Sequence, residues 1–463
     1  ENGLPSKAVD GSTENEERKA ALRGLREGKL AFLFAVDLFN EGLDVPDVNT
    51  LLLLRPTQSA TVFLQQLGRG LRRTPDKDVL TVLDFVGQHR KEYRYGDRIL
   101  SLTGLTKRGL ERAVEQNFPV LPPGCQIVLD RVTKERLLSE LKYHISTGQR
   151  TLAQEIRSYG ETSLIEYLYK SERGIGDIYR NNHYWTEWLR RAGLTAATAS
   201  PVEAHLGRRI RALLHVDDTR RADCYSRLLA ADAPDYEDLP EDEQAFARML
   251  FFSLWRDGGN FATYQEALQQ LRSEKTLCGE INEVLTYSAS SPSYVSTPLT
   301  GELGHIPLAV HAHYSMEEVL AALGWARLGG SVPATMREGV AWCPATRCDA
   351  LFVTLRKNEK EFSPQTMYRD YALAPNLFHW ESQNRTGERS PTGLRYQNHE
   401  REGTYVLLFV RETKVNENGH PSPFLFLGPV RYREHQGERP MAITWELVTE
   451  MPTEFYAKAA IAV

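Results

Sequence analysis

The sequence predicts an α/β domain with a parallel sheet over residues 1–90, an all-α region over residues 91–300, and a mainly β domain over residues 305–463. Three observations support this division. Apolar runs alternate with helical patterns in the first region, strong helix formers fill the second, and short β-type runs between turn residues fill the third. A length of 463 residues also suggests about three domains.

The first region opens on a capping-box pattern, in which Thr13 caps backbone N–H groups and Glu16 reaches back. We expect a helix from there to about Glu27, with Gly28 as its stop. Three apolar runs then predict buried strands, at residues 30–36, 48–54 and 79–86. Because ligands bind at the carboxyl ends of parallel strands, the loops after these runs are candidate site segments.

The other two regions have weaker but consistent patterns. Helix formers dominate residues 135–143, 152–169, 202–214 and 241–255. Ser315 and Glu318 predict a capped short helix. The β-type runs cover residues 349–355, 404–411, 424–427 and 442–447.

Composition narrows the class of protein. The net charge of −5 shows no general preference for nucleic acid, although a local groove would not need one. The five cysteines form no framework, which predicts a reducing, cytoplasmic location, and no apolar run is long enough to predict a membrane span. Cys343 and Cys348, with His379 and His399 in loose reach, leave zinc open as an alternative, but two ordinary thiols are favoured and no metal site is predicted.

Two segments carry the residues of a phosphate-handling site. Residues 34–46 read FAVDLFNEGLDVP, and residues 65–73 read QQLGRGLRR. A transferring phosphoryl group spreads negative charge over its oxygens, and guanidinium groups stabilise that charge. Arg69 and Arg72 are three residues apart, so a helix places them on one face. The alternative is that these arginines form a solvated helix face and that Asp44 is only a turn residue.

Together, the two segments resemble motifs V and VI of superfamily 2 helicases in order and spacing. The resemblance implies a RecA-like lobe that meets ATP and Mg²⁺ held mainly by a first lobe. It implies that the arginine fingers at the γ-phosphate are Arg69 and Arg72. It implies that the other nucleotide-site residues are Gly42, Asp44, Gln65 and Gly68. Gly11 and Ser12 stand where this family often contacts the nucleic-acid backbone.

The match also has departures and absences. Val36 stands where many relatives carry a threonine that contacts a nucleic-acid phosphate, so this contact stays open. The sequence contains no G-x-x-x-x-G-K-[S/T] phosphate loop and no D-E-x-H or D-E-A-D box. We therefore expect a chain that begins within the second lobe, lacks its N-terminal helicase lobe, and hydrolyses no ATP alone.

A second resemblance covers most of the remaining chain. Residues 83–90, 117–125 and 368–411 are similar to a bacterial subgroup that joins a phospholipase-D-type nuclease domain, a helicase motor and a C-terminal domain of unknown function. This combination of domains implies DNA as the track, with RNA left open, and a nuclease domain or subunit as partner. It also implies a role in DNA restriction or phage defence.

The C-terminal domain contains a cluster of residue types that read nucleic acid, in which aromatic rings stack on bases and amides or arginines bond to them. The candidates are His379, Trp380, Gln383, Asn384, Arg385, Arg395 and Tyr396. The favoured alternative places Trp380 and Tyr396 in a β-domain core. The alternative function is a non-enzymatic module that recognises DNA or a protein, with the motor lobe as scaffold.

Two further polar groups predict structural ties. The stretch from His215 to Arg221 contains two aspartates and two arginines, which favours a link between helices or a helix cap. His311 and His313 could form a ligand pair on a strand but lack obvious partners in sequence. We assign neither group a catalytic role.

Overall fold

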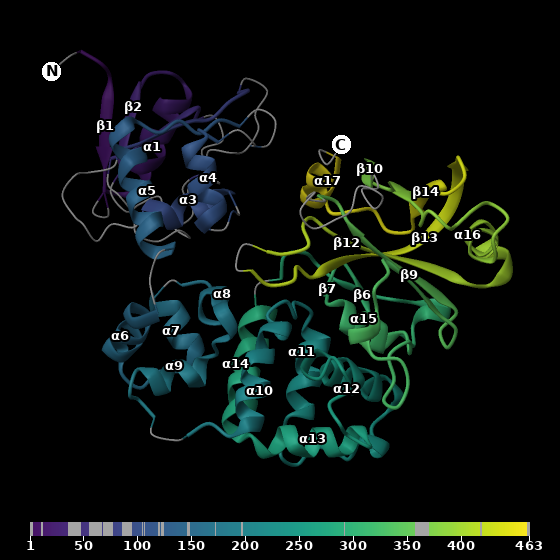
Figure 1. Cartoon of the computed structure of the whole chain (residues 1–463). Helices are drawn as coiled ribbons and strands as arrows, with labels where there is room; N and C mark the ends of the chain where they lie inside the picture. The colour runs from purple at the N-terminus through teal and green to yellow at the C-terminus, as the bar shows by residue number, and fades with distance from the viewer. Residues whose placement is uncertain are drawn as a thin grey trace. The chain divides into compact units, whose positions relative to one another are not determined.

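The computed structural model (Figure 1) forms two compact units, Glu1–Gln149 and Arg150–Val463, which are described separately below. The residues that the structure describes are 3–10, 13–35, 48–54, 67, 77–85, 95–103, 105, 107–118, 121, 125–145, 149–171, 173–195, 198–290, 292–356, 370–416 and 419–460.

The first unit contains two pairs of parallel strands. Its elements are β1 (Ser6–Val9), α1 (Asn15–Arg26), β2 (Phe32–Ala35), β3 (Thr50–Leu53), β4 (Thr81–Asp84), α3 (Tyr95–Thr103), α4 (Lys107–Glu115) and α5 (Arg131–Ile145). Strand β1 pairs with β2 in the register Ser6 to Phe32, and β3 pairs with β4 in the register Thr50 to Thr81. The three predicted strands and their parallel direction are therefore confirmed.

Two local expectations for this unit are wrong. Helix α1 is flanked by Glu14, which makes no side-chain cap, while the Thr13 hydroxyl donates to Asp10 Oδ1 at 3.1 Å. Phe34 on β2 is 45% exposed, so this strand is not covered on both faces as its apolar run predicts. The end of α1 is as predicted, since Gly28 adopts a φ of +69° that favours glycine.

Helices α3, α4 and α5 form a small apolar core that belongs to the first unit, beyond the predicted boundary at residue 90. Its buried members are Ile99, Leu110, Val114, Phe118, Leu137 and Leu141. The three-domain division stays a prediction, because the compact units divide the chain elsewhere.

The second unit begins with a bundle of helices. They are α6 (Gln149–Tyr159), α7 (Leu164–Ser171), α8 (Ile175–Ile178), α9 (Trp185–Arg191), α10 (Pro201–Arg209), α11 (Thr219–Leu228), α12 (Glu241–Leu254), α13 (Tyr264–Ser273) and α14 (Lys275–Ala289), with short 3₁₀ turns at Arg180–Asn182, Ile210–Leu213 and Tyr236–Asp238. Glu280 on α14 joins α9 to the bundle, since it accepts the backbone N–H of Trp185 at 2.8 Å and of Thr186 at 2.9 Å.

The remainder of the second unit is a mixed sheet with three helices. The elements are β5 (Thr297–Pro298), β6 (Ala309–Val310), β7 (His313–Tyr314), α15 (Met316–Ala322), β8 (Val340–Cys343), β9 (Cys348–Thr354), β10 (Tyr371–Ala374), β11 (Leu377–Glu381), α16 (Pro391–Glu402), β12 (Tyr405–Arg411), β13 (Phe424–Gln436), β14 (Ala442–Leu447) and α17 (Thr453–Ala460), with 3₁₀ turns at Gly301–Leu303 and Pro333–Thr335. The sheet order is β10-β11-β14-β13-β12-β9-β8, with β7 paired to β13. Only the β9–β12 pairing in this order is parallel among the described strands. The predicted fold class is confirmed.

The sheet separates two apolar cores. On β12, Leu407 and Phe409 belong to the core shared with the helices, while Val406, Leu408 and Val410 belong to the core on the other face. This alternation follows from the two-residue period of a strand. The helical bundle and the sheet consequently form one compact unit. Within the described ranges, no helix has the length and apolar character needed to cross a membrane.

Candidate functional site

The predicted motor residues lie outside the described residues. They are Gly11, Ser12, Gly42, Asp44, Gln65, Gly68, Arg69 and Arg72. The described strand β2 ends at Ala35, immediately before the segment that carries the G-L-D-x-P pattern. Leu67, inside the second motif, is 6% exposed. Their roles at the nucleotide stay predictions.

Two of the predicted nucleic-acid contacts lie in the core of the C-terminal sheet. Trp380 is 5% exposed and Tyr396 is 1% exposed. Their rings lie 5.7 Å apart, and Tyr396 also packs on Trp445 at 6.0 Å. Rings packed in this way are covered on both faces by protein, so their position agrees with the structural alternative.

Arg395 lies beside this core and is paired with a buried carboxylate. Its Nε and Nη2 donate to Asp349 at 2.6 and 2.8 Å, and its guanidinium carbon lies 4.2 Å from the centre of the Trp342 ring. Burial raises the pKa of Asp349, which is fully covered, and the contact with Arg395 opposes that rise. The pair links α16 to β9.

The remaining candidates lie nearer the surface. Gln383 Nε2 donates to Glu338 at 2.9 Å, and Arg385 forms an ion pair with the same carboxylate. These hydrogen bonds lower the pKa of Glu338. His379 is half-buried and stacks on Tyr371 with ring centres 4.7 Å apart. With exposed Asn384, these side chains form the accessible part of the predicted cluster.

Helix α16 was not predicted, although its ends carry ordinary signals. The Ser390 hydroxyl accepts the backbone N–H of Gly393 at 3.0 Å, Pro391 occupies the first turn, and Gly403 ends the helix with a φ of +60°. Ser-Pro at the start and Gly at the end would have indicated this helix. It positions Arg395 and Tyr396.

The cysteine pair is buried on the β8–β9 hairpin, where Cys343 and Cys348 face each other in register. Burial raises the pKa of both thiols, that of Cys348 to about 12. His399 accepts the backbone N–H of Tyr432 at 3.1 Å. Across the described part of the chain, no three His, Cys, Asp or Glu side chains are grouped to hold a metal ion.

The polar stretch from His215 to Arg221 and the histidine at position 313 meet in one buried network. Arg221 on α11 is fully buried, and its Nη1 donates to Glu318 on α15 at 3.0 Å while Nη2 donates to the His313 carbonyl at 2.8 Å. Its Nε lies 2.9 Å from Asp218, and its guanidinium carbon lies 4.2 Å from the centre of the Tyr314 ring. The network joins the helical bundle to the sheet.

Two histidines extend this network. His215 Nε2 lies 2.5 Å from Glu318 Oε2, and His313 Nδ1 lies 2.6 Å from Asp217 Oδ2. The predicted cap at Ser315 is confirmed as a complete capping box with Glu318. Burial alone would raise the pKa of Glu318, but Arg221 and His215 outweigh that effect and hold it at about 2.

Replacement of Glu318 gives a pH-dependent test of this network. The folded-state pKa of about 2 lies below the ordinary value of 4.5, so the stabilisation is complete above 4.5 and is lost as the pH falls towards 2. We expect Glu318→Gln to cost on the order of 3 kcal/mol at neutral pH. Urea unfolding of both proteins should show this gap closing as the pH falls below 4.5. A gap independent of pH would contradict the assignment.

Comparisons with known proteins support the class that the fold and the motifs define. Residues 1–74 match the family described as helicase conserved C-terminal domain, and residues 308–459 match a domain of unknown function, DUF3427. These matches support the predicted C-terminal half of a superfamily 2 helicase with a C-terminal domain of unknown function.

Three curated relatives illustrate the extent of the similarity. A putative ATP-dependent helicase IRC3 of Saccharomyces cerevisiae is 34% identical over 87 residues, which are 19% of this chain and 13% of the relative. A 51.5 kDa protein of a Lactococcus phage is 36% identical over 19% of this chain and 20% of its own length. The ATP-dependent RNA helicase drs1 of Neosartorya fischeri is 39% identical over 33% of this chain and 19% of its own length. The chain spans a fifth or less of each of these relatives.

Proposed function

We propose that the intact protein is an ATP-dependent DNA helicase or translocase, in which this chain supplies motifs V and VI. The observation that carries the proposal is the pair of segments at residues 34–46 and 65–73, at helicase spacing and within the matched residues 1–74. The named helicases among the relatives support the same reaction class.

The proposed mechanism assigns a step to each motif. Arg69 and Arg72 would stabilise charge on the γ-phosphate, and Asp44 and Gln65 would orient the nucleotide. Guanidinium groups fit this task because they bind phosphate oxygens in a fork. Mg²⁺ would neutralise phosphate charge from the first lobe. Closure of two lobes on ATP, followed by opening after hydrolysis, would step the protein along a strand.

We further propose DNA as the track and DNA restriction or phage defence as the context, with a nuclease domain or subunit as partner. The support is that matches to a helicase domain and to DUF3427 occur on the same chain. Among the C-terminal candidates, we propose that the accessible residues His379, Gln383, Asn384 and Arg385 contact nucleic acid. Trp380 and Tyr396 would support them from the core.

A strand-displacement assay tests the proposed track. The intact protein is mixed with a tailed DNA duplex or a tailed RNA duplex of the same sequence, with and without ATP. We expect ATP-dependent release of the DNA strand, because the proposed role in restriction or phage defence requires DNA as the track. Release from RNA alone would reject the DNA assignment, and a matched Arg72→Ala protein controls for passive melting.

A further inference from the structure

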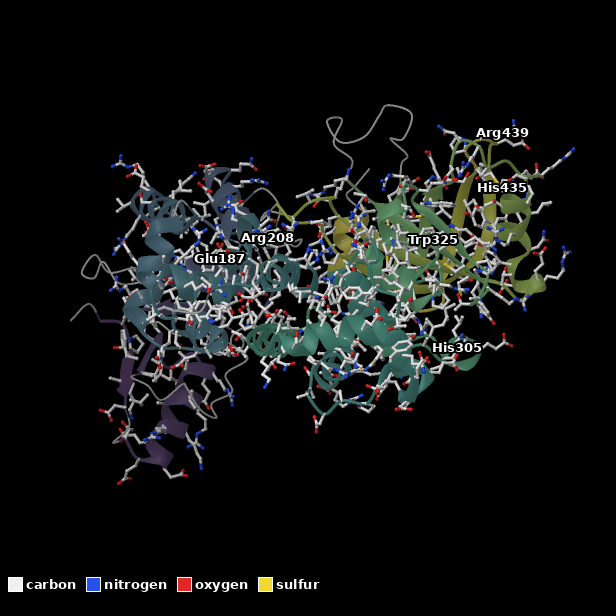
Figure 2. The ribbon with its side chains drawn as sticks, turned by 60° about the horizontal axis from the view of Figure 1, so that its bottom comes forward. Glu187, Arg208, His305, Trp325, His435 and Arg439 are labelled. Atoms are coloured by element: carbon white, nitrogen blue, oxygen red, sulfur yellow. The ribbon has the colours of Figure 1, made fainter. Side chains whose placement is uncertain are left out.

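A cavity of about 500 Å³ lies in the second unit, between helices α12 and α13 and the segments on either side of α15. Helix α12 and the start of α13 form one wall, and the chain after α15 forms the other. Its floor is apolar, from Pro307, Ala322, Ala326 and Leu328. His305, labelled in Figure 2, stands at its exposed edge. This volume falls in the range of small-molecule sites.

Two arginines line this cavity without a carboxylate partner. Arg248 Nη1 donates to the Tyr236 hydroxyl at 2.9 Å, and Arg327 Nε donates to the Gly324 carbonyl at 2.9 Å. Within the described ranges, neither guanidinium lies within ion-pair distance of an acidic side chain. Each therefore retains N–H groups that point to solvent or to a ligand.

A tyrosine, Tyr264, lines the same cavity as these two arginines. Tyr264 accepts the backbone N–H of Leu328 at 2.9 Å, and its own proton goes to none of the described residues. Burial raises the pKa of Tyr264, while the charges of Arg248 and Arg327 oppose that rise. Arg248, Arg327 and Tyr264 line one cavity, so their N–H and O–H groups are available to the same ligand.

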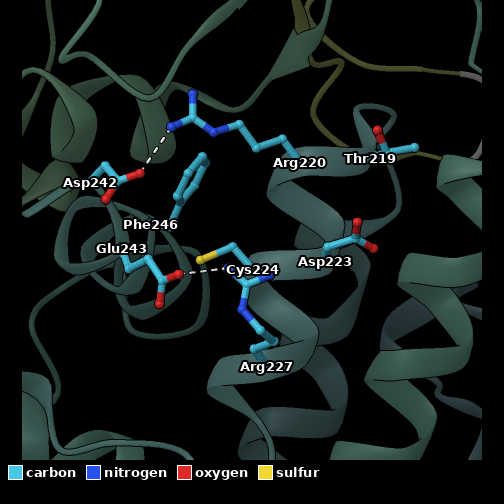
Figure 3. A pocket seen from close by; sticks show the side chains of 8 residues that line it. All are labelled: Thr219, Arg220, Asp223, Cys224, Arg227, Asp242, Glu243 and Phe246. Atoms are coloured by element: carbon cyan, nitrogen blue, oxygen red, sulfur yellow. Dashed lines mark hydrogen bonds and ion pairs between the residues drawn. The ribbon is translucent and has the colours of Figure 1, made fainter. Parts of the chain in front are cut away.

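A second hollow in the same unit is also lined by two arginines, but each of them is paired with a carboxylate. Figure 3 shows the pocket between α11 and α12, of about 320 Å³, where Arg220 pairs with Asp242 at 3.0 Å and Arg227 pairs with Glu243 at 2.7 Å. Both arginines of this pocket are therefore already neutralised by an ion pair. Of these two hollows, the cavity of Arg248 and Arg327 is the one whose arginines have no carboxylate at ion-pair distance among the described residues.

We propose that this cavity binds a small phosphate-bearing ligand of nucleotide size, with the phosphate on Arg248 and Arg327 and the remainder over the apolar floor. Arginine forks match phosphate oxygens, and Tyr264 supplies a third donor. Glu241 at the edge can accept an amino group of a base. A volume of about 500 Å³ has room for one mononucleotide but not for a long strand.

Calorimetric titration of the full chain tests the proposal with three probes: deoxyadenosine monophosphate, inorganic phosphate, and an oligothymidylate of about 12 nucleotides. We expect the mononucleotide to bind more tightly than phosphate. The Arg248→Ala/Arg327→Ala protein should bind it about tenfold or more weakly. Arg337→Ala is the matched control, since this exposed arginine bonds only to the neighbouring Ala334 and Met336 carbonyls among the described residues.

Each outcome decides the proposal. Unchanged mononucleotide affinity in the double variant would overturn it, as would equal affinity for phosphate and mononucleotide. Tighter binding of the oligonucleotide through the same arginines would replace the small ligand with a strand. If the double variant unfolds, Arg327→Gln, which alters an exposed side chain, carries the same comparison. No ATP turnover is measured, so failure here leaves the motor assignment separate.

Discussion

Replacement of Arg72 with alanine in the intact protein is expected to lower ATP turnover by about 10³-fold or more, the usual scale for an arginine finger. The reason is that, in the proposed role, the guanidinium would stabilise negative charge that develops on the γ-phosphate in the transition state. Steady-state ATP hydrolysis at saturating single-stranded DNA measures the effect. ATP binding should change much less, since the proposed mechanism has the first lobe hold most of the nucleotide.

Arg73 supplies the matched control for this experiment. It is the next residue in the chain and carries the same charge, and on the expected helix it would fall outside the face that Arg69 and Arg72 would share. Arg73→Ala should keep turnover within a few-fold of wild type. Near-normal turnover in Arg72→Ala, or equal losses in both variants, would remove the finger assignment.

The second large effect is expected in stability. Arg221→Met should destabilise the second unit by about 3–5 kcal/mol, because it removes the buried guanidinium that pairs with Glu318 and Asp218. All seven tryptophans lie in residues 150–463, so tryptophan fluorescence during urea unfolding reports this unit alone. The change should appear as a lower midpoint.

The neighbouring Arg220 is the control for Arg221. Its side chain is 49% exposed and pairs with Asp242, which is itself 44% exposed. Exposed pairs contribute little, so Arg220→Met should change stability by about 0.5 kcal/mol or less. Equal effects of the two substitutions would show that burial of the network is not what stabilises the unit.

Much of the fold could be predicted from local sequence patterns. The apolar runs at residues 349–355, 404–411 and 442–447 became β9, β12 and β14, and Ser315 with Glu318 formed its capping box. These succeeded because each pattern is satisfied by residues a few positions apart. Thr13 failed, because a competing partner, Asp10, lay equally near on the other side.

Long-range contacts could not be predicted in the same way. The polar residues from His215 to Asp218 and the histidine at 313 were recognised separately, but Arg221 and Glu318 meet across 97 positions of sequence. Likewise, Arg248 and Arg327 come from different parts of the unit and line one cavity only after folding. The predicted nucleotide residues lie outside the described residues, and their prediction rests on the spacing that a phosphate site imposes.

The most direct test of the central claim is the rate of ATP hydrolysis by the intact protein, measured with and without single-stranded DNA. An ATP-driven translocase should hydrolyse ATP faster when the DNA is present, and Arg72→Ala should abolish that increase. A rate that neither DNA nor RNA changes, or an intact protein without ATP turnover, would contradict the assignment of this chain to a nucleic-acid motor.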